Sequence, residues 1–166
     1  MTAPHSGSLP GSLPFPLGGS LVTYATSGDA SEIGRNLKLG PDGDLVVEGG
    51  QLQLVAGLDS VAQDIRCALG AFQTFDPLTG EPNGEWAFDN TVGIPWLRDI
   101  LGQKADIPKV REIFRRAILR RQGVVDVPTL THEYDPTTRN LSVAFTARVE
   151  LGRLTGTITG SVGGSV

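Results

Sequence analysis

Two neighbouring C-terminal segments with strict two-residue alternation restrict the fold more than any other feature of the chain. Every second residue of 141–151 is apolar, and most residues between them are small or polar. After Gly152-Arg153, a pair suited to a two-residue hairpin turn, residues 154–162 continue the alternation. Because alternate side chains of a strand point to opposite faces, this pattern predicts an antiparallel hairpin with one apolar face.

The second half of this hairpin carries no charged side chain, since none follows Arg153 up to Val166. A long uncharged strand at the edge of a sheet can pair with a strand of another chain. The sequence leaves two alternatives. The edge is covered within the chain, or it accepts or donates a strand in an assembly.

The middle of the chain predicts short strands followed by helices. Turn sequences at Pro41-Asp42-Gly43 and Gly49-Gly50 divide residues 35–57 into a small β meander. Apolar residues at helical spacing predict a helix over 59–72, with Asp59 or Ser60 as its N-cap.

Two further helices are predicted before the C-terminal strands. A short helix over 96–101 begins after Pro95, and a longer one begins after Asp106 and stops at Gly123. A strand over 127–134 follows. The predicted class is α+β, with a small N-terminal β meander, two to three helices and a C-terminal antiparallel β-hairpin sheet with an open edge.

The high content of Gly, Ser and Pro in residues 1–34 predicts a flexible leader that a partner orders. Residues 35–166 are predicted to form the folded domain.

The 166 residues carry a net charge of −4, which favours no general attraction to nucleic acid. The lone Cys67 excludes an intrachain disulfide. No apolar run approaches the roughly 20 residues needed to span a bilayer, so no membrane contact is expected.

Residues that could carry catalysis are few. Only His5 and His132 could serve a histidine-based site, and neither has acidic or nucleophilic residues in a suitable pattern nearby. Glu81, Glu85 and Asp89 lie in one irregular segment but are more typical of solvated loop carboxylates than of a glycosidase pair. We therefore predict no catalytic, cofactor-binding or metal-binding residues, and no enzyme activity.

The third predicted helix is locally basic. Seven basic residues of 104–121 oppose only Asp106 and Glu112. The basic face is formed by Arg111, Arg115, Arg116 and Arg120. A nucleic-acid-binding module using helix 108–121 is therefore an alternative function. Two observations weigh against it, since no aromatic residue is interleaved on that face and the whole chain is acidic.

The order of several short motifs resembles the phage baseplate wedge family that initiates the contractile sheath, in its Mu-like and T-even-like branches. The resemblance covers about residues 36–153. The motifs are Gly43-Asp44-Leu45, Val55-Ala56-Gly57 leading into Val61-Ala62-Gln63-Asp64-Ile65, Gly84-Glu85-Trp86-Ala87-Phe88-Asp89, Gly93-Ile94-Pro95-Trp96 with Ile100-Leu101-Gly102, Gly123-Val124-Val125-Asp126-Val127, and Arg139-Asn140-Leu141-Ser142-Val143.

The resemblance implies a structural protein of a contractile tail, located in the virion baseplate and made in the host cytoplasm. The implied partners are the sheath protein, the tail tube protein and other baseplate wedge proteins, with six copies in a ring. It favours the second alternative for the uncharged edge, strand exchange with the first sheath ring.

Two groups of residues follow as candidate contacts. The strands expected to contact the sheath contain Leu141, Val143, Phe145, Ala147, Val149, Leu154, Thr155, Thr157, Ile158 and Thr159. The expected wedge platform contains Glu85, Trp86, Phe88, Asp89, Pro95 and Trp96.

Overall fold

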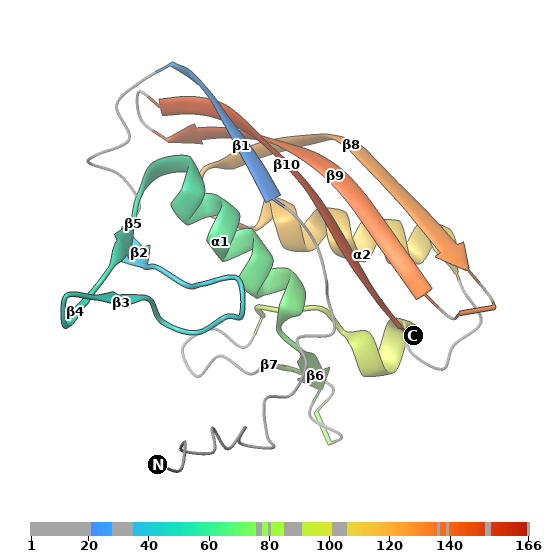
Figure 1. Ribbon diagram of the computed structural model, residues 1–166. Coiled ribbons are helices and arrows are strands. Elements are labelled where there is room, and N and C mark those ends of the chain that lie inside the picture. The colour runs from blue at the N-terminus through green and yellow to red at the C-terminus, as the bar shows by residue number, and fades with distance from the viewer. Residues whose placement is uncertain are drawn as a thin grey trace, which may run out of the picture.

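The computed structural model describes residues 21–27, 35–75, 78–79, 81–84, 91–100, 106–135, 137–138, 140–151 and 154–165. A four-stranded antiparallel sheet packs there against two α-helices that lie on one of its faces (Figure 1). The predicted α+β class is confirmed.

The main sheet has the strand order β1-β10-β9-β8. Its C-terminal strands are β8 (Val124–Asp135), β9 (Asn140–Leu151) and β10 (Leu154–Ser165). β9 and β10 form the predicted hairpin, with Leu151 opposite Leu154. β8 and β10 extend beyond the predicted ranges because backbone pairing continues past the part of the sequence that alternates.

The fourth strand, β1 (Leu21–Ser27), comes from the segment expected to be a leader. It runs antiparallel to β10, so that Leu21 lies opposite Gly160 and Ser27 opposite Thr155. The edge of β10 that we expected to be open is therefore covered by β1 over Thr155–Gly160. Residues 161–165 of β10 lie beyond the end of β1. The division of the chain at residue 34 stays a prediction.

One hydrophobic core lies between the sheet and the helices. The alternating residues of β9 point into it as predicted, and Ile158 of β10 is also completely buried. Fully buried residues from the helices and the loop before η1 face them. These are Ile65 and Leu69 of the first helix, Phe114 and Ile118 of the last helix, and Ile94.

The helices are α1 (Gly57–Gly70), the five-residue π-helix η1 (Trp96–Ile100) and α2 (Ile107–Leu119). Asp106 caps α2 as predicted, because its Oδ1 accepts a hydrogen bond from the backbone N–H of Lys109 at 3.2 Å. α2 ends before Gly123, whose φ of +80° belongs to the turn into β8.

The predicted cap of α1 is wrong. α1 begins at Gly57 after Ala56, without a side-chain cap. Ser60 instead accepts a hydrogen bond from the side chain of Asn36 at 2.8 Å. Gln63 bonds the backbone carbonyl of Leu37 and the backbone N–H of Leu39, each at 2.8 Å. Both polar side chains therefore hold the meander against the helix.

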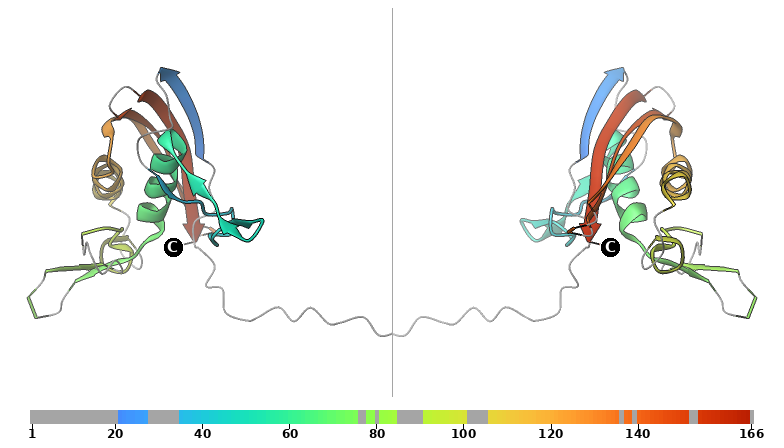
Figure 2. Two further views of the ribbon diagram at one scale, coloured as in Figure 1. Left: turned by 90° about the vertical axis from the view of Figure 1, so that its left-hand side faces the viewer. Right: turned by 90° about the vertical axis from the view of Figure 1, so that its right-hand side faces the viewer.

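The meander contains β2 (Asn36–Leu37), β3 (Val47–Glu48), β4 (Gln51–Leu52) and β5 (Leu54–Val55). β3 pairs with β4 across Gly49-Gly50, which adopt positive φ as the predicted tight turn requires. A second hairpin, β6 (Gln73–Phe75) with β7 (Pro82–Gly84), was not predicted. It projects from the body of the protein (Figure 2, green).

Candidate functional site

The two edges of the main sheet differ in chemistry. The β8 edge carries Asp126, Glu133 and Asp135, contains Pro128, and has two register shifts between Val124 and Thr129. Charges, proline and bulges are the usual means of preventing edge-to-edge pairing. The β8 edge is therefore protected against added strands.

The β1–β10 edge lacks the charges and the proline of the β8 edge. Neither β1 nor β10 contains a charged residue or a proline. β1 pairs with only half the length of β10, and its register is irregular between Ala25 and Ser27. In Figure 1, β1 and β10 lie side by side on the opposite side of the sheet from β8. This edge is suited to backbone pairing.

The structure places most of the predicted sheath-contacting residues inside the protein. The alternating residues Leu141, Val143, Phe145, Ala147 and Val149 are buried, and β9 is paired on both sides. On β10, Ile158 is buried whereas Thr159 is exposed. Thr155 and Thr157 are half-buried, and the side chain of Leu154 lies outside the described residues. A partner strand can therefore reach β10, but not β9, without breaking the hairpin.

Of the predicted wedge platform, Glu85, Trp86, Phe88 and Asp89 lie outside the described residues. Pro95 and Trp96 are buried. The Trp96 ring meets Phe114 edge to face, with centroids 5.5 Å apart and planes at 80°. Trp96 thus joins η1 to α2 within the core. The platform as a contact surface stays a prediction.

The four arginines predicted as one basic face are divided in the structure. Arg115 turns toward β8, where it donates to the backbone carbonyl of Val127 at 2.9 Å. Arg116 pairs with Glu112 one helical turn away at 3.1 Å. Arg120 donates to the backbone carbonyl of Thr91 at 3.3 Å, and Arg111 is exposed.

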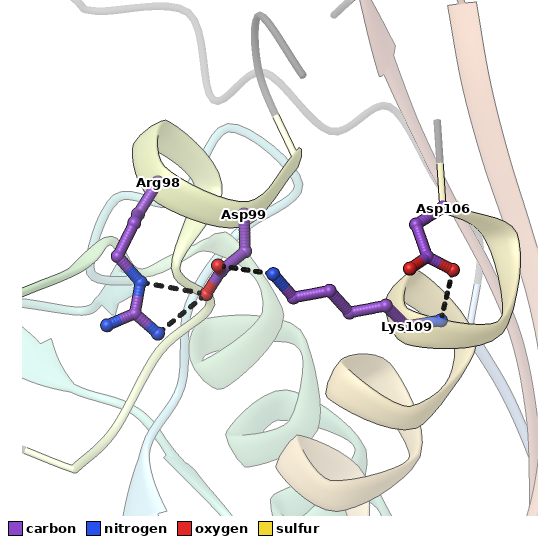
Figure 3. A network of polar contacts seen from close by, with 4 residues as sticks. All are labelled: Arg98, Asp99, Asp106 and Lys109. Carbon is purple, nitrogen blue, oxygen red and sulfur yellow. Dashed lines mark hydrogen bonds and ion pairs between the residues drawn. The ribbon is translucent and has the colours of Figure 1, made fainter. Parts of the chain in front are cut away.

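A groove of about 420 Å³ lies beside α2 and was not predicted from the sequence. Its walls come from α1, β6, the loop before η1, η1 and α2. Figure 3 shows Asp99 of η1 between Arg98 of the same helix and Lys109 of α2. Asp99 bonds Arg98 and Lys109, each at 2.8 Å. Hydrogen bonds from the Arg98 side chain and then Lys109 hold the pKa of Asp99 below its usual value.

Titratable groups elsewhere in the described part of the chain do not assemble a reactive site. Burial raises the pKa of the Cys67 thiol, and nearby Asp64 adds to this effect, which favours the protonated, unreactive thiol. No group of three metal-ligating side chains is found among the described residues. None of the described helices is long and apolar enough to cross a bilayer.

A family model for contractile injection system sheath initiators matches residues 35–152. The chain belongs to this family. No curated protein matched the chain.

Sheath initiators are structural components of contractile tails that interact with sheath and baseplate components. The family resemblance inferred from the motifs is therefore confirmed. The family match begins after β1, so the strand that covers β10 comes from outside the matched residues. In the sequence, the absence of charge from 21–27 was the available signal for β1.

Proposed function

We propose that this sheath initiator surrounds the tail tube in a ring of six copies and starts the sheath by strand exchange with the first sheath ring. In this role it is a structural wedge protein of a virion baseplate, without enzyme activity. The observation that carries the proposal is the contrast between the protected β8 edge and the uncharged β10 edge.

An arriving sheath strand takes the outer edge of β10. It begins at 161–165, which β1 does not cover, and displaces β1 from Thr155–Gly160. β1 pairs six residues of β10, whereas a longer strand can pair all twelve. Since each added backbone hydrogen bond contributes about 0.5–1.5 kcal/mol net, the longer strand is favoured over β1.

The alternation of β10 sets the register of the incoming strand. Ile158 faces the core and Thr159 faces away from it, so a slip of one residue would reverse every side chain of the added strand. The edge thus supplies both backbone hydrogen bonds and a defined register for the first sheath ring.

A lysine at the exposed edge tests this proposal. Ser161 is exposed, lies beyond β1 and is paired with Ala144, which is also exposed and lies one strand further from the edge. Ser161→Lys should lower the fraction of tubes that acquire a sheath by about fivefold, as expected for a cost of about 1 kcal/mol at an added strand. Electron microscopy of baseplates mixed with tube and sheath protein measures this fraction.

Ala144→Lys is the matched control, because it places the same charge on the same face of the sheet but not on the edge strand. It should leave sheath formation unchanged. Equal sheath formation by Ser161→Lys and the unaltered protein would contradict strand exchange at this edge. Deletion of residues 154–166 is a poorer test, because it removes Ile158 from the core.

The alternative function, nucleic-acid binding by the helix within 108–121, gains little from the structure. Arg115 and Arg116 are engaged with Asp126 and Glu112, and the four arginines do not form one continuous face. We retain it only as an outcome to be measured.

A further inference from the structure

The groove beside α2 has an apolar floor and a cationic rim. Ala68 of α1, Phe75 of β6, and Ile113 and Ala117 of α2 contribute apolar surface. The guanidinium of Arg98 lies 3.5 Å from the centroid of the Phe75 ring, so that charge and apolar surface are joined at one wall. A mixed surface of this kind suits a peptide rather than a small ion.

Positive charge exceeds negative charge around this groove. Its lining includes five cationic side chains, Arg98, Lys109, Arg116, Arg120 and Arg121, and two carboxylates, Asp99 and Glu112. Both carboxylates are paired with cations of the lining itself. The groove is therefore cationic although the whole chain carries a net charge of −4.

Arg121 is the cation of the groove whose burial is least matched by its polar contacts. Its side chain is 11% exposed, and its Nε is buried without a hydrogen-bond partner among the described residues. Its ion pair with Asp64 is long, at 3.8 Å, and burial raises the pKa of Asp64. Because a buried cation is costly unless it is well paired, this site favours an additional anionic group.

We propose that the groove is a docking site for an acidic segment of a neighbouring baseplate protein. A carboxylate of that segment pairs with Arg120 and Arg121, and an aliphatic side chain rests on Ile113 and Ala117. Arginine is well suited to this role, because its planar group can bond a carboxylate with two parallel hydrogen bonds.

An acidic peptide fits this groove better than a nucleic acid does. Asp99 and Glu112 would repel a chain of phosphates, whereas a peptide can place apolar side chains beside them. None of the described residues that line the groove belongs to β1 or β10, so this inference is independent of the proposed strand exchange.

Fluorescence anisotropy tests the proposal with the full chain and a labelled peptide of repeated Glu-Glu-Leu at low salt. We expect saturable binding, and at least about tenfold weaker binding of a peptide with Gln in place of Glu. Arg116→Ala combined with Arg120→Ala should also weaken binding by about tenfold. Both arginines are exposed, and circular dichroism checks that the double variant stays folded.

Arg111→Ala is the matched control, because Arg111 is exposed on the same helix but does not line the groove. It should bind the peptide as the unaltered protein does. Absence of saturable binding, equal binding of the Gln peptide, or an equal loss in Arg111→Ala would overturn the proposal. The proposal would also be overturned if a labelled oligothymidylate bound more tightly than the Glu-Glu-Leu peptide and this binding depended on Arg116 and Arg120. That result would favour a phosphate ligand.

Discussion

Val22 of β1 lies directly opposite Thr159 of β10 in the antiparallel pairing that closes the main sheet. The pairing joins a segment near the start of the chain to its C-terminal hairpin. It covers part of the edge of the sheet whose described strands carry no charge and no proline. In the proposed function, this edge opens when a sheath strand displaces β1.

Loss of β1 pairing should expose the edge of β10. Thr23 lies opposite Ile158 in the middle of β1, and Thr23→Pro removes a backbone donor and restricts the strand. We expect concentration-dependent self-association, measured by light scattering. Ser6→Pro, outside β1, is the control and should not self-associate. Purely monomeric Thr23→Pro protein would show that β1 does not protect this edge.

β10 should contribute to the stability of the fold as well as to assembly. Ile158 is 0% exposed, and Ile158→Ala should lower the free energy of unfolding by about 2–5 kcal/mol. Thr159→Ala, at the neighbouring exposed position, should change it by less than about 0.5 kcal/mol. Urea denaturation measures both. Equal effects of the two changes would indicate that β10 is an arm detached from the core.

The ion pairs of Asp99 with Arg98 and Lys109 should make the free energy of unfolding depend on pH in the acidic range. The pKa of Asp99 is lowered in the folded protein, so its ionised form stabilises the fold at any pH above its unfolded pKa of about 4. This contribution is lost as the pH falls through the lowered, folded pKa. Asp99→Asn should be less stable than the unaltered protein at neutral pH.

The comparison of urea midpoints at neutral and strongly acidic pH checks this sign. The difference between Asp99→Asn and the unaltered protein should shrink on acidification, because both side chains are then uncharged. A difference that stays constant with pH would show that Arg98 and Lys109 do not stabilise the folded protein through the Asp99 charge.

The sequence predicted the elements whose local pattern agrees with their tertiary role. The alternation of 141–151 indicated both the strand and its buried face, and Asp106 indicated the start of α2, because each signal acts locally. The family followed from short motifs in a fixed order, which do not require knowledge of the packing.

Other features depend on contacts between distant segments. Ser60 and Gln63 resemble capping residues, but their partners are in the meander, at sequence separations of 24 to 26 residues. The paired residues of β1 and β10 are 128 to 139 positions apart, from Ser27 with Thr155 to Leu21 with Gly160, and no local pattern reports such pairing. The groove likewise forms only where five segments meet. From the sequence alone, its arginines therefore predict only a basic face of one helix.

A reversible lock between β1 and β10 tests strand exchange most directly. Val22→Cys with Thr159→Cys, in a Cys67→Ala background, places two thiols at directly opposite strand positions within disulfide reach. Each single cysteine variant is the control for oxidation. The measurement is the fraction of tubes that acquire a sheath, counted by electron microscopy with oxidised and then reduced protein. The account predicts that the oxidised lock blocks sheath formation and that reduction restores it. Equal sheath formation by the oxidised and reduced protein would contradict displacement of β1 by a sheath strand.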